Sequence, residues 1–289
     1  EHVGNGYTPC WEDGFQREDC CADHFGPGGN PTCWQAHYTY DFCCRKEPPD
    51  PTSSIDMPHT FVVPAYDLNV GNNLKRYGTF SPRQSYELQW LVRRGDVVVD
   101  AGANLGAYTV SLAARVGTEG TVHAFEPFRL TFQQLTANVA LNGLANVYTH
   151  NLALGRNFTR VRAYATDITG PTVPASVQVL NQMSHEEARR VSMVYSPTRE
   201  RIRVVPLDFL GLRRLDLLKI DVEDMELEVV LGAKRTLRRC RPRIWAESVQ
   251  HFEKGDRSFV KEVESQGYRC QPVGVWATYE LMCIPVATK

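Results

Sequence analysis

Apolar runs alternate with amphipathic stretches along the chain from Phe61 onward. Short apolar runs predict buried strands, whereas apolar residues spaced three and four apart predict helices. The expected strands are Val97–Asp100, Val122–Glu126, Val147–Asn151, Leu215–Asp221, Ile244–Glu247, Tyr268–Val275 and Glu280–Ile284. Strands that alternate with helices indicate an α/β domain with a mostly parallel sheet. Only a short connection separates the last two strands, so we expect them to form an antiparallel pair.

Helical spacing is clear in three segments between these strands. "AYTVSLAARVG" and "RLTFQQLTANVALNG" each end at a glycine, Gly117 and Gly143. "MELEVVLGAKRTLRRC" carries basic residues in its last turns, where the helix dipole favours them. The stretch Arg156–Val205 is long, polar and poorly periodic, which is typical of a functional loop. We expect a strand near Val161–Ala165 and a helix near Ser184–Val194 within this stretch, which would act as a lid or substrate loop.

The first 46 residues have a different pattern. "CWEDGFQREDCC" (Cys10–Cys21) recurs as "CWQAHYTYDFCC" (Cys33–Cys44), so six of the nine cysteines lie in a tandem repeat. So short a segment cannot bury enough apolar area to fold without cross-links. We therefore expect a small disulfide-rich module at 1–46, a proline-rich linker at 47–60 and one large domain at 61–289.

Disulfides would place the protein in an oxidising compartment: the secretory lumen, another oxidising lumen or the cell exterior. Zinc binding is the alternative for the repeat, although adjacent cysteine pairs fit the usual ligand spacing poorly. Cys270 and Cys283 lie on the two final strands and are either a further disulfide or two small buried side chains. In the first case Cys240 remains a free thiol. The triplet Asn157-Phe158-Thr159 is a glycosylation sequon.

Composition excludes several partners. The chain has 32 Lys and Arg against 33 Asp and Glu, a balance that does not favour a nucleic-acid surface. No apolar run approaches the roughly 18 residues that a membrane span requires. The chain opens with Glu1 and no signal-like segment, so we expect any targeting segment to lie outside this sequence.

Polar residues close five of the expected strands, where a parallel sheet binds ligands. These residues are Asp100, Glu126, Asn151, Asp221 and Glu247. One or two acids could merely cap loops, but buried carboxylates are costly unless they are paired. Four acids at consecutive strand ends favour a binding site.

The turn after the first of these strands indicates the ligand. Asp100-Ala-Gly102-Ala-Asn104-Leu-Gly106 lacks the middle glycine of a dinucleotide turn, and no phosphate-binding lysine follows it, which disfavours a dehydrogenase. Glu126, twenty residues later, can accept both hydroxyls of a ribose. Asp100 can receive an ammonium group, directly or through water. A phosphate-free ligand with an adenosyl ribose and an ammonium is S-adenosylmethionine.

Four segments together resemble the FkbM-type methyltransferases: "VVVDAGANLGAYTVSLAARVGTEGTVHAFEP", "NVALNGLANVYTHNLALG", "LDLLKIDVEDMELEVVLGA" and "YELMCIP". The resemblance covers roughly residues 61–289, including "LKRYGTFSPRQSYEL" at its start. It implies a Rossmann-like class I methyltransferase fold, S-adenosylmethionine as donor and O-methylation of sugars or natural products. The expected donor site comprises Asp100, Gly102, Asn104, Gly106, Glu126, Asn151, Leu152 and Asp221. Two departures concern the acceptor and the partner: Asp224 replaces the usual glycine after "KIDVE", and the cysteine repeat lies outside the family.

A hydroxyl acceptor must lose its proton, so a positioned base would help by about 10²–10⁴-fold. The candidates are Asp221, Glu223, Glu247 and His251, of which His251 has the most suitable ordinary pKa. Asp221, Glu223 and Glu247 could instead bind Mg²⁺ or Ca²⁺, which would acidify the hydroxyl.

The sequence therefore favours an S-adenosylmethionine-dependent O-methyltransferase that acts on a carbohydrate or another small hydroxylated acceptor. The alternative is a non-catalytic binding or structural subunit that reuses this fold and docks to a protein partner through the Cys10–Cys44 repeat. The intact acids and glycines of the donor site favour the enzyme.

Overall fold

The structure is a computed structural model of the chain, and it describes residues 59–65, 67, 69–166, 195–273 and 279–286. The expected cysteine-rich module at 1–46 and the helix expected near Ser184–Val194 lie outside these residues. Of the linker expected at 47–60, the structure describes only residues 59 and 60.

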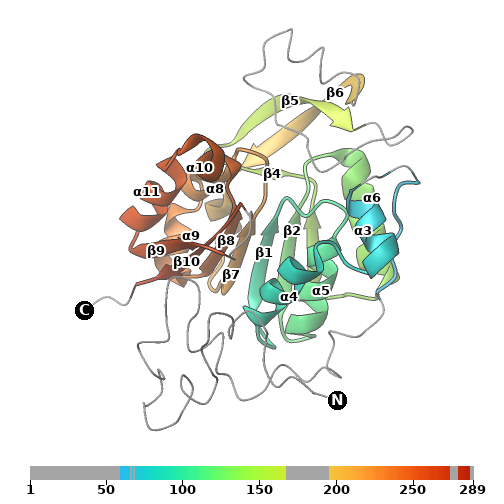
Figure 1. Cartoon of the computed structure of the whole chain (residues 1–289), viewed down its shortest axis with the longest axis horizontal. Coiled ribbons are helices and arrows are strands. Elements are labelled where there is room, and N and C mark those ends of the chain that lie inside the picture. Colours follow the sequence, from blue (N-terminus) through green and yellow to red (C-terminus); the bar gives the residue numbers. More distant parts are fainter. Residues whose placement is uncertain (1–58, 66, 68, 167–194, 274–278, 287–289) are drawn as a thin grey trace.

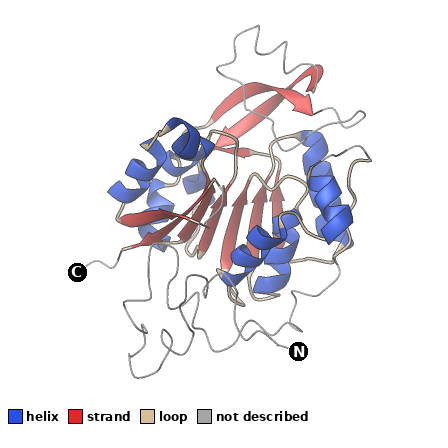
Figure 2. Cartoon of the chain, viewed as in Figure 1, coloured by secondary structure: helices blue, strands red, loops and turns tan. Residues whose placement is uncertain are grey.

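A seven-stranded sheet forms the centre of the described domain, in the order β3-β2-β1-β7-β8-β10-β9 (Figures 1 and 2). Its strands are β1 (Val97–Ala101), β2 (Thr121–Phe125), β3 (Val147–His150), β7 (Leu217–Ile220), β8 (Arg243–Glu247), β9 (Tyr268–Pro272) and β10 (Glu280–Pro285). The strands β3, β2, β1, β7 and β8 pair in parallel, whereas β10 is antiparallel to both β8 and β9. This order confirms the expected Rossmann-like α/β fold, its mostly parallel sheet and its C-terminal antiparallel pair.

Helices cover both faces of the sheet (Figure 2). They are α3 (Val70–Tyr77), α4 (Pro82–Trp90), α5 (Ala107–Val116), α6 (Arg129–Leu141), α8 (Glu226–Leu231), α9 (Lys234–Cys240), α10 (Val249–Lys254) and α11 (Ser258–Ser265). Gly117 and Gly143 follow α5 and α6 with positive φ, at the positions where the sequence predicts the helix ends.

Successive side chains along each strand point to opposite faces of the sheet and therefore pack against different helices. Val99 of β1 packs in one apolar cluster with α8, α9 and α11. Val98 packs in another with α4 and α5, together with Leu217 of β7. Two residues further along the same strands, Asp100 and Lys219 therefore face α5 as well.

The order of the strands reverses between β1 and β7. From β1 the chain moves outward to β2 and β3, and it then returns to the other side of β1 to form β7 and β8. In open α/β sheets such a reversal leaves a crevice beyond the carboxyl ends of the two central strands. In this chain the residues at that point are Gly102 and Asp221.

The stretch Arg156–Val205 contributes to a second, three-stranded sheet above the carboxyl ends (Figure 1). It consists of β4 (Ala153–Leu154), β6 (Tyr195–Val205) and β5 (Thr159–Thr166), in that order. The strand expected near Val161–Ala165 is confirmed as β5. The long strand β6 was not expected from the sequence.

A disulfide joins Cys270 of β9 to Cys283 of β10. The two residues are directly opposite each other in the antiparallel pair, and Cys283 is completely buried. Of the two interpretations of these cysteines, the structure supports the cross-link. Cys240 at the end of α9 is free, as expected in that case. Within the described ranges, none of the helices has the length and apolar character that crossing a bilayer requires.

Candidate active site

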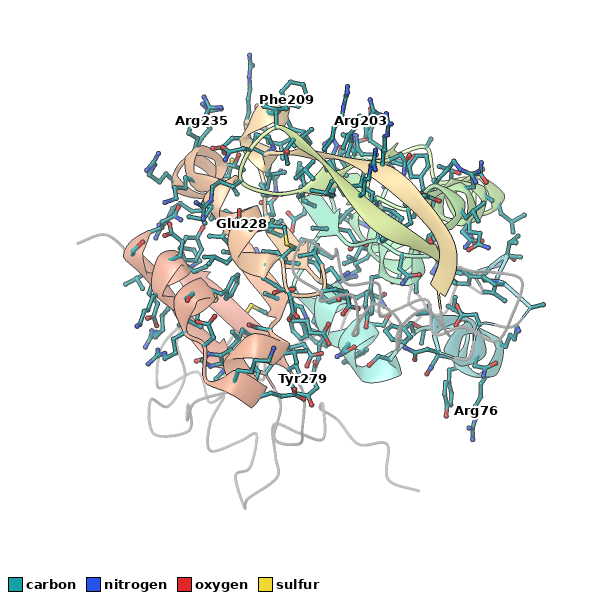
Figure 3. All side chains as sticks on the ribbon, turned by 90° about the horizontal axis from the view of Figure 1, so that it is seen from above. Arg76, Arg203, Phe209, Glu228, Arg235 and Tyr279 are labelled. Carbon is teal, nitrogen blue, oxygen red and sulfur yellow. A yellow bond between two sulfur atoms is a disulfide. The ribbon has the colours of Figure 1, made fainter. Side chains whose placement is uncertain are left out.

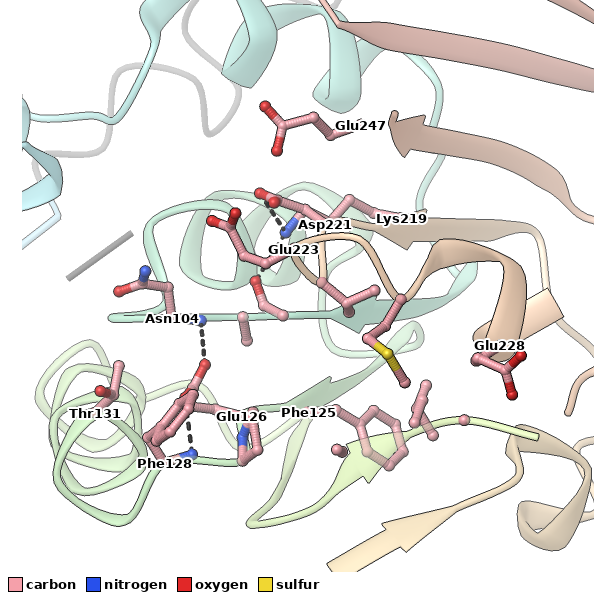
Figure 4. Close-up of a pocket in the computed structure, with 18 of the residues that line it drawn as sticks. Asn104, Phe125, Glu126, Phe128, Thr131, Lys219, Asp221, Glu223, Glu228 and Glu247 are labelled. Atoms are coloured by element: carbon pink, nitrogen blue, oxygen red, sulfur yellow. Dashed lines mark hydrogen bonds and ion pairs between the residues drawn. The ribbon is translucent and has the colours of Figure 1, made fainter. Parts of the chain in front are cut away.

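A cavity of about 1020 Å³ lies at the carboxyl ends of the central strands. Its walls come from the loops after β1, β2, β7 and β8, from α4 and α5, and from β5 and β6 of the small sheet. The strand-end residues Glu126, Asp221 and Glu247 line it, as do Gly102, Asn104 and Leu152 from the expected donor site. The structure thus brings most of the expected site residues to one place (Figure 4).

The turn after β1 brings its backbone against β7. Gly102 has a φ of +79°, and a Cβ placed on it would lie 1.7 Å from the carbonyl oxygen of Asp221. The amides of Gly102 and Ala103 both donate to the carbonyl of Phe125, at 3.0 and 2.9 Å. Only glycine fits at this position, because it has no side chain and tolerates the left-handed conformation.

Glu126 at the end of β2 holds this turn. One carboxylate oxygen accepts a hydrogen bond from the amide of Asn104, and the other accepts one from the amide of Phe128, both at 3.0 Å (Figure 4). The side chain is buried, and this burial raises its pKa from 4.5 to about 7. Each oxygen keeps a second lone pair, so the carboxylate can still accept hydrogen bonds from a ligand.

Asn151 and Leu152 follow β3. Leu152 lines the cavity. The side-chain amide of Asn151 instead donates to the carbonyls of Glu126 and Pro127, both at 3.0 Å. Asn151 therefore supports the segment that carries Glu126, and it is not among the residues that line the cavity.

Asp100, which was expected to receive an ammonium group of the ligand, does not reach the cavity. Its side chain is completely buried and does not line the cavity. One oxygen accepts a hydrogen bond of 2.6 Å from Thr109, and the other lies 3.1 Å from Nζ of Lys219. Asp100 therefore does not line the cavity itself, whereas its ion-pair partner Lys219 does.

Lys219 was not predicted from the sequence to belong to the site. It lies directly beside Asp100 in the sheet, lines the cavity and is 2 % exposed. Its ammonium donates to the carbonyl of Gly102 at 2.9 Å and lies 3.4 Å from a carboxylate oxygen of Asp221. Burial lowers the pKa of Lys219, but the two aspartates outweigh burial and raise it, so the ammonium stays charged. A lysine inside the apolar run "LLKI" was the available signal.

Several carboxyl groups lie close together in the part of the cavity beyond the ends of β7 and β8. Burial, followed by the charges of Asp221, Glu226 and Asp224, raises the pKa of Glu223 from 4.5 to about 8. Burial and the adjacent Asp221 likewise raise the pKa of Glu247 far above its usual range. Groups with such pKa values hold or accept protons near neutral pH, as an acid or base in catalysis must.

The loop after β7 has a strained backbone at two consecutive residues. Glu223 and Asp224 have φ values of +54° and +71°. Asp224 occupies the position where the resembling family has glycine, and the structure shows why glycine suits it. Aspartate is among the few residues that adopt this conformation at modest cost. Glu223, the first of these two residues, lines the cavity.

A hydrogen-bonded chain forms another wall. The hydroxyl of Tyr108 donates to Gln84 at 2.6 Å, and the amide of Gln84 donates to Glu280 of β10. Burial and the nearby charges of Asp221 and Glu280 raise the pKa of Tyr108, so its phenol remains protonated. Trp245 of β8 also lines the cavity. None of these residues was predicted from the sequence to belong to the site.

His251 does not belong to the site. It lies on α10, with Nδ1 3.3 Å from the carbonyl of Asp256 and its ring against Phe252. The cavity lining includes Val249 of the same helix but not His251. Among the residues that the structure describes, no group of three or more His, Cys, Asp or Glu side chains is arranged to hold a metal ion. Asp221, Glu223 and Glu247 thus form an acidic cluster without such an arrangement.

Comparisons with known proteins are consistent with this site. Residues 100–270, more than half of the chain, match the family described as "Methyltransferase FkbM domain". "Methyltransferase 1" of Beauveria bassiana is 32% identical over 143 residues, which cover 47% of this chain and 57% of that protein. "Methyltransferase sdnD" of Sordaria araneosa is 28% identical over 155 residues, which cover 47% of this chain and 59% of that protein. The chain thus spans less than two thirds of the length of either relative.

Among solved structures, a methyltransferase FkbM from Methylobacillus flagellatus has 16% sequence identity and a TM-score of 0.45. The match covers 65% of this chain and 43% of that one. The domain match includes the Gly102 turn, Glu126 and Lys219 with its aspartates, the residues that build the crevice. The chain belongs to the family of methyltransferase FkbM domains.

Proposed function

We propose that this chain transfers a methyl group from S-adenosylmethionine to a hydroxyl oxygen of a carbohydrate or another small hydroxylated molecule. The donor supplies an electrophilic methyl group on a sulfonium, so the protein has to align two molecules and accept one proton. A volume of about 1020 Å³ is at the upper end of the range of about 300–1,000 Å³ for ligand pockets, which leaves room for both molecules.

The residues around the Gly102 turn fit the donor. Glu126 can accept hydrogen bonds from the ribose hydroxyls, because it lines the cavity and keeps free lone pairs. The glycine lets the ligand lie close to the backbone of the turn. A diphosphate would be repelled by Glu126 and the acids beyond it, which favours a nucleoside without phosphate.

The charge of the cavity lining also fits a cationic donor. Six carboxyl groups line the cavity against two basic side chains, Arg156 and Lys219. Both bases are paired, Arg156 with Glu228 at 3.0 Å and Lys219 with its two aspartates. The remaining carboxyl groups attract a sulfonium where they are ionised, and they disfavour an anionic acceptor. A neutral polyol or sugar is therefore the better acceptor.

Glu247 and Glu223 are the residues in position to accept the proton of the acceptor hydroxyl. Both line the cavity, and their raised pKa values make the ionised form a stronger base than an ordinary carboxylate. Trp245 and Tyr108 can pack against the acceptor. The observation that carries the proposal is that Glu126, Asp221, Glu223 and Glu247 surround one cavity at the reversal of the strand order.

The proposal is tested by incubating the protein with methyl-labelled S-adenosylmethionine and a panel of sugars, polyols and amines. We expect label on a hydroxyl compound and a loss of rate of about 10²-fold or more in Glu247→Gln or Glu223→Gln. His251→Ala, the control outside the cavity, should retain the rate. Label on none of the hydroxyl compounds, or only on amines, would contradict the proposal.

We further propose that the protein works in an oxidising compartment. The Cys270–Cys283 disulfide supports this, since such bonds persist mainly outside the cytosol. Mass spectrometry of the unreduced protein from a secreting host should find these two cysteines, and the six of the N-terminal repeat, without free thiols. Free thiols at these positions would contradict the proposed compartment.

A further inference from the structure

The strands β5 and β6 place arginines directly opposite one another. Arg160 pairs with Arg203, and Arg162 pairs with Arg201, in the antiparallel register. Residues that are directly opposite or two apart along a strand point to the same face. These four exposed side chains therefore share one face of the two strands, which we call the arginine face.

The other face of the same strands is apolar and turned inward. Val161 is directly opposite Ile202, and both pack against Phe128. Val161 and Val204 also line the cavity. The two strands are therefore fixed with the apolar side toward the domain and the arginine face toward solvent.

The arrangement of charges on the arginine face is not explained by the fold. Like charges directly opposite each other destabilise a strand pair. Within the described part of the chain, no ion pair to any of the four arginines is present. Features that cost stability without a structural benefit commonly mark a functional surface.

Two exposed phenylalanines lie beside the arginine face. Phe158 directly precedes β5, and Phe209 belongs to the 3-10 helix η4 (Leu207–Leu210) that follows β6. Each is 63% exposed, and their rings make an edge-to-face contact with centroids 5.2 Å apart. Figure 3 shows Arg203 and Phe209 along the same edge of the molecule. A pair of exposed phenyl rings is costly in water and favourable at an apolar boundary.

We propose that the arginine face and the Phe158–Phe209 pair bind the surface of an anionic membrane. Guanidinium groups form bidentate hydrogen bonds with phosphates, and a flat row of them suits a plane of lipid headgroups. The two phenyl rings can enter the boundary between headgroups and acyl chains. The inner side of the same strands lines the cavity, so a docked protein would hold its active site close to the membrane.

A lipid surface fits these observations better than a soluble polyanion. A sulfated or phosphorylated polymer would engage the arginines, but it offers no apolar layer for the phenyl rings. The net charge of the whole chain is −1, so attraction to an anionic surface must come from a local patch. The arginine face is such a patch.

The test measures co-sedimentation of the full chain with phosphatidylcholine vesicles, with and without phosphatidylserine. We expect binding only when phosphatidylserine is present. The double variant Arg162→Ser/Arg201→Ser should bind about 30-fold more weakly, which is ~1 kcal/mol for each arginine. Phe209→Ser should weaken binding in addition. Raising the ionic strength from about 0.1 to about 1 M should abolish binding, because the Debye length falls from about 10 to about 3 Å.

A matched control has the same change of charge elsewhere. Arg93→Ser/Arg94→Ser alters two exposed arginines before β1, at the opposite ends of the strands, and should bind like the wild type. Thermal melting separates a folding defect from a binding defect, since removing the opposed arginines should leave the melting temperature unchanged or higher. Absence of wild-type binding to phosphatidylserine vesicles would overturn the proposal. So would equal weakening in both double variants, or binding to heparin with none to vesicles. None of these results bears on methyl transfer, which is measured separately.

Discussion

Gly102→Ala places one methyl group at the closest approach between β1 and β7. The added Cβ would lie 1.7 Å from the carbonyl oxygen of Asp221 and 2.8 Å from its carbonyl carbon. Ordinary contact begins at 3.4 Å, so the backbone after β7 would have to move away. That movement strains the hydrogen bond of 3.0 Å from the amide of Asp221 to the carbonyl of Ala101. It also separates the turn from Lys219, which donates to Gly102.

The magnitude follows from these separate costs. The left-handed conformation costs an alanine about 1–2 kcal/mol. Forced displacement of a packed backbone adds about 1–3 kcal/mol, and a weakened hydrogen bond adds about 1 kcal/mol. We therefore expect Gly102→Ala to lower the free energy of unfolding by about 3–6 kcal/mol.

Gly143→Ala is the matched control. Gly143 has a φ of +64° and no atom within 4 Å of the added Cβ, so its substitution has only the conformational cost. Urea denaturation should show Gly102→Ala to be less stable than Gly143→Ala by about 2 kcal/mol or more. In thermal melting the difference should be about 4–8 °C. Equal stabilities of the two variants would refute the close approach of Gly102 to β7.

Three further substitutions or conditions test other parts of the structure. Lys219→Met leaves the carboxylate of Asp100 buried without its cation, so the free energy of unfolding should fall by about 3–5 kcal/mol in urea denaturation. Folding raises the pKa of Glu126 from 4.5 to about 7, so between these pH values the folded state holds a proton that the unfolded state has released. The free energy of unfolding should therefore fall by up to about 3 kcal/mol as the pH rises through this range, and Glu126→Gln should flatten this dependence. Reduction of the Cys270–Cys283 disulfide, whose cysteines are 13 residues apart in sequence, should lower the free energy of unfolding by roughly 3 kcal/mol. The melting temperature should therefore be lower in the presence of dithiothreitol. A melting temperature that does not respond to dithiothreitol would argue against the disulfide.

The central sheet could be predicted from the sequence because its strands are buried on both faces. The run Val97–Asp100 is continuously apolar up to a terminal acid, Leu215–Asp221 is apolar apart from Asp216 and Lys219 before its terminal acid, and glycines mark the helix ends. The strand β6 was missed because its face toward solvent carries arginines. The strict alternation of Arg201, Ile202, Arg203 and Val204 was a signal for a half-buried strand, but the charge density around it suggested a loop.

The candidate site could be predicted at the level of strand ends but not of side-chain partners. Glu126 and Asp221 reach the cavity, as their positions predict. Asp100 does not, because it points toward α5 and is paired with Lys219, and strand pairing across more than a hundred residues cannot be obtained from local pattern. His251 was favoured by its ordinary pKa alone, whereas burial gives the carboxyl groups of Glu223 and Glu247 their raised pKa values.

The proposed function depends on a nucleoside donor that binds at the turn between β1 and α5. Calorimetric titration with S-adenosylhomocysteine at about pH 8, where Glu126 is ionised, tests this directly. We expect wild-type binding on the order of 10 µM, about −7 kcal/mol. Glu126→Gln should weaken it by about 10–100-fold through loss of a charged acceptor, and Glu119→Gln, in an exposed turn, should leave it unchanged. Absence of binding to the wild type, or equal binding by Glu126→Gln, would contradict the account.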